Sequence, residues 1–135
     1  MTPEQKLKHA ILLRAVEMES IDTIEIPVTA ENVDALFDES NEDWELQDAR
    51  NEMRSGQVET GIDCEWSRHY ESKAVAAQMP DGSWVGWTYW FGGGKHGEPE
   101  AIDWMDSAYA LICTEEIKTM TVRTFTIPPE AATSM

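Results

Sequence analysis

A glycine-rich stretch at residues 92–97, GGGKHG, is the local motif with the most chemical promise. Consecutive glycines let the backbone turn its amide groups toward an anion, and a neighbouring lysine can add positive charge. The stretch is not a P-loop, because the spacing differs and no Ser or Thr follows the lysine. The alternative is a flexible connection that leaves a central strand. The anion-binding residues would be Gly93, Gly94, Lys95 and His96.

The histidines and cysteines are too scattered for a metal site. The chain has three His and two Cys, and no close pair of them has the spacing of a zinc ligand set. Cys64 and His69 would point to opposite faces if one strand carried both, which disfavours a Cys–His catalytic pair. We therefore assign no metal ligand, no cofactor and no catalytic residue.

Acidic residues concentrate in the first half of the chain. The net charge is −16 over 135 residues, and residues 16–65 hold sixteen Asp and Glu against two Arg. Such a charge disfavours direct contact with nucleic acid or an anionic membrane, since phosphate contacts need cations. The acidic stretch is either a solvated face or a surface that meets a basic partner, whose approach it would accelerate.

We expect the contacts with a basic partner protein to lie in residues 31–65. Carboxylates that were spaced like phosphates would mimic a nucleic-acid backbone, so the expected partner is a nucleic-acid-binding protein whose site would be blocked. Small size and acidity are also typical of the accessory proteins and inhibitors that phages and mobile elements encode. The residues assigned to partner binding are Asp38, Glu39, Glu42, Asp43, Glu45 and Asp48.

Aromatic residues concentrate in residues 83–91, SWVGWTYWF, which hold three of the six tryptophans of the chain. In a strand, Trp84 and Trp90 share one face and Trp87 lies on the other. Both faces are therefore apolar, and we expect the sheet to be covered on both. Such residues are most often core, but aromatic anchors are also typical of interfaces. Trp84, Trp87 and Trp90 are thus the expected interface of a homodimer.

Helix signals occupy the N-terminal part of the chain. A capping box at residues 2–5 precedes an apolar stripe that runs to Met18. Thr29 is expected to cap a second, short helix. Ser40 is expected to cap a third helix, which ends at Gly56 and has acids in its first turn and arginines in its last.

Strand signals dominate the rest of the chain. The turn signature PDG at residues 80–82 makes residues 72–92 a hairpin. The expected fold is α+β, with N-terminal helices packed on an antiparallel sheet of four to five strands and this Trp-rich hairpin at its centre. Alternating apolar residues predict further strands at 24–28, 58–66, 109–113 and 119–127.

The length fits a single α+β domain at residues 1–127, followed by a flexible tail at 128–135. The chain shows no secretion-signal pattern, and no apolar run approaches the roughly 18 residues of a membrane span. We therefore expect a cytoplasmic protein with reduced thiols and no membrane contact.

Three functions remain open from the sequence. The first is a non-enzymatic acidic interaction protein that binds a basic surface of a partner protein. The second is a small-molecule or anion-binding enzyme or sensor that uses the loop at 92–97, with Lys95 and His96. The third is a structural or assembly subunit that self-associates through the aromatic sheet.

Overall fold

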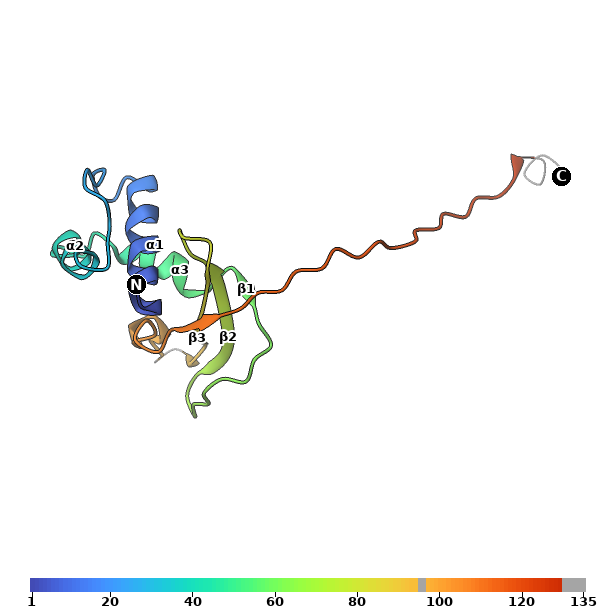
Figure 1. Ribbon diagram of the computed structural model, residues 1–135. Helices are drawn as coiled ribbons and strands as arrows, with labels where there is room; N and C mark the ends of the chain where they lie inside the picture. Colours follow the sequence, from blue (N-terminus) through green and yellow to red (C-terminus); the bar gives the residue numbers. More distant parts are fainter. Residues whose placement is uncertain (95–96, 130–135) are drawn as a thin grey trace.

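Helices come first and the sheet second in the computed structural model, which describes residues 1–94 and 97–129 (Figure 1). Within the described residues, the sheet has four antiparallel strands in the order β1-β2-β3-β4, which confirms the expected α+β fold. The elements are α1 (Pro3–Glu17), α2 (Val33–Ser40), α3 (Gln47–Arg54), β1 (Val58–Glu59), β2 (Glu71–Gln78), β3 (Trp84–Phe91), the 3-10 turn η2 (Pro99–Ala101) and β4 (Tyr109–Leu111).

Helix α1 begins at the predicted capping box. The Gln5 backbone N–H donates to the Thr2 hydroxyl at 3.2 Å, and the Thr2 N–H donates to the Gln5 side-chain oxygen at 3.0 Å. Two of the amide groups that a helix start leaves unpaired are thus satisfied. The apolar stripe, with Leu7, Ile11 and Leu12 fully buried, packs against α2, α3 and the sheet.

The central hairpin is formed as predicted, with Glu71 opposite Phe91 at one end and Gln78 opposite Trp84 at the other. Its turn is closed by the Met79 N–H, which donates to the Ser83 carbonyl at 2.7 Å. Gly82 has a φ of +87°, a conformation that glycine adopts without steric cost. The hairpin signal is local, so the register follows from the turn and from the alternation on both strands.

The helices lie on one side of the sheet, and the core forms between them (Figure 1). Trp87 of β3 is fully buried there, and its ring centroid lies 5.2 Å from that of Trp104, with the planes tilted by 38°. Helix α3 is tied to the same strand by two hydrogen bonds. The Trp87 indole N–H donates to the Arg54 carbonyl at 2.9 Å, and the Arg54 guanidinium donates to the Trp90 carbonyl at 2.6 Å.

The second face of the sheet carries small residues at its centre, including Ala74, Ala76 and Gly86, all buried. A Cβ on Gly86 would lie 2.7 Å from side-chain atoms of both Tyr109 and Leu111, so these two side chains lie directly over it. No helix of the described residues covers this face. We expected both faces of the sheet to be covered. In the described residues a helical layer covers only one of them.

All four strands predicted outside the hairpin are shortened or missing, and the one at 109–113 is reduced to Tyr109–Leu111. Residues 24–28 form a loop instead of a strand, and Pro27 has no N–H to donate to a ladder. Of residues 58–66, only Val58 and Glu59 pair as a strand, with Ala76 and Val75. Residues 119–127 do not pair with any strand of the described chain, although their alternation and composition favour one.

Beyond β4 the chain runs away from the folded body as an extended segment (Figure 1). We call residues 112–127 the arm. Its large apolar side chains are almost fully exposed, with Ile117 at 100%, Phe125 at 86% and Val122 at 84%. Whether residues 1–127 act as one domain with a flexible tail stays a prediction, and residues 130–135 lie outside the described chain.

Candidate functional site

The six carboxylates that the sequence assigned to partner binding lie in one continuous stretch, residues 38–48, which we call the acidic end. Asp38 and Glu39 belong to the last turn of α2, and Asp48 belongs to the first turn of α3. Glu42, Asp43 and Glu45 lie in the turns between these helices. All are exposed except Glu45, which is half-buried.

The third helix begins later than predicted. Ser40 does not cap it but is the last residue of α2, and α3 starts only at Gln47. The intervening turns are held by the Asn41 side-chain oxygen, which accepts the Leu46 N–H at 3.2 Å, and by full burial of the Leu46 side chain. Sequence reasoning missed this break, because the acids at 42–45 match a helical first turn equally well.

Trp44 is the most unusual residue of the acidic end. Its φ is +65°, in the left-handed region that bulky side chains rarely adopt, at a cost of about 1–2 kcal/mol. Its side chain is 73% exposed, so the strained backbone is not offset by burial of the indole. The left-handed turn instead presents a large aromatic group to solvent between Asp43 and Glu45. No sequence signal distinguished this tryptophan from a core residue.

The end of α1 adds two further acids to this region. Glu19, Asp22, Glu39 and Glu45 line an open hollow of about 400 Å³ between the end of α1 and the end of α2. Glu19 has a φ of +60°, and it and Trp44 are the two non-glycine residues with positive φ in the described chain. Both unusual backbone positions thus fall in one acidic region, and sequence reasoning found only part of it.

No cation of the described chain neutralises the acidic end. The ion pairs of the described residues lie elsewhere, for example between Lys8 and Asp34 at 3.0 Å and between Arg14 and Glu52 at 2.9 Å. Within residues 1–94 and 97–129, none of the six carboxylates assigned to partner binding has a salt bridge. Their negative potential is therefore available to an incoming molecule.

The glycine loop has structural reasons for its composition. Gly92, Gly93 and Gly94 all have positive φ, between +67° and +89°. A Cβ on Gly93 would lie 2.6 Å from the Tyr70 ring, so this position needs glycine for close packing as well. The other two residues assigned to an anion site, Lys95 and His96, lie outside the described residues. Anion binding by this loop therefore stays a prediction.

The three tryptophans expected at an interface differ in exposure. Trp87 is fully buried under the helices, so its side chain is not accessible to a partner in this fold. Trp84 and Trp90 are half-buried on the second face of the sheet. An interface through this strand stays a prediction, and it concerns the second face.

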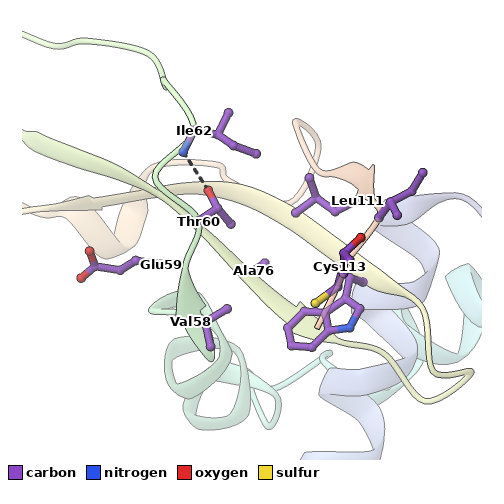
Figure 2. A pocket seen from close by; sticks show the side chains of 10 residues that line it. Val58, Glu59, Thr60, Ile62, Ala76, Leu111 and Cys113 are labelled. Atoms are coloured by element: carbon purple, nitrogen blue, oxygen red, sulfur yellow. Dashed lines mark hydrogen bonds between the residues drawn. The ribbon is translucent and has the colours of Figure 1, made fainter. Parts of the chain in front are cut away.

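An open groove of about 290 Å³ lies on that second face. Figure 2 shows Val58, Thr60 and Ile62 along one side of it, Leu111 and Cys113 along the other, and Ala76 between them. We call this hollow the open-face groove. Its full lining is Val58, Glu59, Thr60, Ile62, Ala76, Trp84, Leu111, Ile112, Cys113 and Thr114.

Thiol and metal chemistry receive no support from the side-chain arrangement. Cys64 and Cys113 are both free thiols, and the Cys64 thiol donates to the Ser72 hydroxyl at 3.5 Å rather than to a histidine. In the part of the chain that the structure describes, no group of three or more His, Cys, Asp or Glu could hold a metal ion.

No family model matches this chain, no curated protein is detectably similar to it, and no solved structure resembles it at a significant level. Among the described residues, no helix is both long enough and apolar enough to cross a bilayer.

Proposed function

We propose that the protein is a non-enzymatic interaction protein whose acidic end binds a basic surface of a partner protein. The observation that carries this proposal is Trp44, an indole 73% exposed at a φ of +65° among carboxylates that no described cation neutralises. Strained backbone positions persist where function requires them, and exposed tryptophans are enriched among the residues that dominate binding energy.

The acidic end and Trp44 would act at different stages of binding. The carboxylates raise the rate of encounter with a surface rich in Lys and Arg, and salt weakens this effect. Trp44 then contacts an arginine of the partner face to face, a cation–π arrangement that also buries the indole. A basic surface of this kind is also what a nucleic-acid-binding protein uses for phosphates, so we propose that the bound partner loses access to nucleic acid. We place this activity in the cytoplasm.

Charge reversal tests this proposal. In the first variant, Glu39, Glu42, Asp43 and Asp48 are changed to Lys, and in the second only Trp44→Ala is made. The matched control reverses four exposed acids elsewhere, namely Glu98, Glu100, Asp103 and Asp106. All of the substituted residues are exposed, so circular dichroism of the three variants should show the wild-type fold.

Pull-down from a lysate, followed by mass spectrometry, measures which proteins each variant captures. We expect a basic protein that wild type and control retain and that the acidic-end reversal loses. Trp44→Ala should weaken its capture, and added nucleic acid should compete with it. Equal capture by the acidic-end reversal and the wild type would contradict the proposal.

A second candidate function is a structural or assembly subunit, and the open-face groove favours it. Apolar side chains that remain half-exposed on one sheet face, with Trp84 and Trp90 among them, are typical of surfaces that contact another protein. Light scattering over a range of protein concentrations tests self-association directly. A mass equal to that of one chain at every concentration would contradict it.

A further inference from the structure

The arm has the properties of a strand without a partner. Residues 117–127, IKTMTVRTFTI, consist largely of β-branched and aromatic residues, which favour pleated strands. Five of their side chains, Ile117, Met120, Val122, Phe125 and Ile127, are 76–100% exposed. An extended segment with such exposed apolar side chains is a template for pairing with another chain.

The arm cannot reach the groove of its own chain by a tight turn. Residues 112–127 contain no Gly, Pro, Asn or Asp, the residues that tight turns favour. The first three residues of the arm already form one wall of the open-face groove, and the rest leads away from the body (Figures 1 and 2). Sixteen extended residues span about 50 Å, which is enough to cross the sheet of a neighbouring molecule.

The open-face groove fits an extended apolar chain. Val58 and Ile62 on one side are 47% and 48% exposed, so the apolar side chains of an incoming strand can pack against them. The groove opens on the face that no described helix covers. Alternate side chains of a strand could therefore enter it while the others face solvent.

Charge also favours a second copy as the occupant. Residues 117–127 contain two cations, Lys118 and Arg123, and no acid, whereas the whole chain has a net charge of −16. Asp63 follows Ile62 directly and Glu65 comes two residues later, and neither has an ion pair among the described residues. Residues 117–127 are thus electrostatically complementary to the acidic body, although Glu115 and Glu116 bring the net charge of the whole arm to zero.

We propose that the arm of one copy lies in the open-face groove of a second copy, and that the second arm lies in the groove of the first. Because each arm starts at the wall of its own groove, a two-fold axis at this point brings each arm across the other body. The two arms then run antiparallel beside one another, and the interface is closed and self-complementary. This exchange is independent of the acidic end, whose charge reversal should leave it unchanged.

Sedimentation velocity of the full chain, over a dilution series, measures the association. The arm variant carries Val122→Asp with Phe125→Asp, and the groove variant carries Ile62→Asp, all at exposed positions. The matched control is Ile26→Asp. Ile26 is also an exposed apolar residue, at 54%, and it lies in the loop before α2. Because all of these positions are exposed, circular dichroism should show one fold throughout.

We expect wild type and control to dimerise alike. The arm variant should raise the dissociation constant of the dimer by about 100-fold or more, and the groove variant by about 10-fold. An equimolar mixture of arm and groove variants should associate more tightly than either alone, because one intact arm meets one intact groove. A monomeric wild type, or a dimer that tolerates the arm variant, would overturn the proposal. An unimproved mixture would show that the arm contacts some surface other than the groove.

Discussion

Two β-favouring stretches of this chain have opposite fates. Residues 84–91 form the central strand, with Trp87 fully buried, whereas residues 117–127 are extended and unpaired, with Phe125 86% exposed. Both stretches are rich in aromatic and β-branched residues. The difference lies in their neighbours. The first follows a tight turn that supplies a partner strand at once, whereas the second is not joined by such a turn to any strand of the described residues.

This contrast shows that a high strand propensity does not by itself make a segment form a strand. A strand forms where a second strand supplies hydrogen bonds and where a layer covers its apolar face. The central strand obtains both inside one chain. The arm obtains neither, and so its apolar side chains remain available for another molecule.

The largest expected effect compares one aromatic residue from each stretch. Trp87→Ala should lower the free energy of unfolding by about 3–5 kcal/mol, because it removes a fully buried indole and leaves a cavity beside Trp104. Phe125→Ala should change it by less than about 0.5 kcal/mol, since the ring contacts little in the monomer. Urea denaturation at low protein concentration measures both, because dilution removes any contribution from association.

Trp87→Phe is the milder companion if the alanine variant fails to fold. It keeps an aromatic ring in the core but removes the hydrogen bond from the indole to the Arg54 carbonyl. A large loss of stability in Phe125→Ala under these dilute conditions would mean that the arm packs on its own body. The two β-favouring stretches would then no longer differ in burial.

An intermediate effect is expected where the two stretches are linked through β4. Gly86→Val would place side-chain atoms where Tyr109 and Leu111 now lie, 2.7 Å from the new Cβ. We expect a loss of about 1–3 kcal/mol of unfolding free energy through overpacking. Amide hydrogen exchange at Ala110 should also accelerate, because β4 would separate from β3.

Thr88→Val is a suitable control for this variant, since it changes a buried residue of the same face without adding volume. If Gly86→Val left the exchange of β4 amides unchanged, the close packing of Tyr109 and Leu111 over the sheet would be wrong. The root of the arm would then be held by other contacts.

The smallest effect concerns pH and the turn that gives the central strand its partner. Hydrogen bonds from the Ser83 hydroxyl and backbone N–H, with a further contribution from Lys6, lower the pKa of Asp81 from 3.8 to about 2. A carboxyl whose pKa is lowered in the folded state stabilises the protein above pH 3.8, and this contribution is lost as the pH falls toward 2. Asp81→Asn should therefore reduce the pH dependence of stability between these values.

Thermal unfolding of wild type and Asp81→Asn across this pH range measures the difference. The other acids titrate in both proteins, so only the difference between the two curves reports on the turn. Parallel curves would show that Asp81 contributes nothing to holding the hairpin turn.

Local signals predicted the parts of the fold whose partners are close in sequence. The capping box at Thr2 and the hairpin at 72–92 both depend on contacts a few residues apart, and both are present. The strand at 109–113 was also found, shortened to Tyr109–Leu111. Tertiary contacts decide the rest, such as the missing strands at 24–28 and 119–127, where alternation alone was misleading.

The candidate site was predictable in charge but not in shape. The six acids at 38–48 are exposed, apart from the half-buried Glu45. This exposure is expected from the sequence, because charged side chains are seldom buried without partners. The left-handed turn at Trp44 depends on Leu46 being anchored in the core and on the hydrogen bond from Asn41, and neither is visible in the sequence pattern. The contribution of Glu19 and Asp22 required the end of α1 to be positioned beside α2.

The distribution of the tryptophans has an optical consequence. Two indoles in van der Waals range couple excitonically, so Trp87 and Trp104, whose ring centroids lie 5.2 Å apart, should give a far-ultraviolet dichroism couplet that reports core packing. Trp44 and Trp66 are 73% and 81% exposed and should emit at the long wavelengths of hydrated indole. With Trp66 replaced by Phe, a blue shift of the emission would follow docking at Trp44 while the couplet followed the integrity of the core. Binding and unfolding of the unlabelled protein could then be separated by wavelength alone.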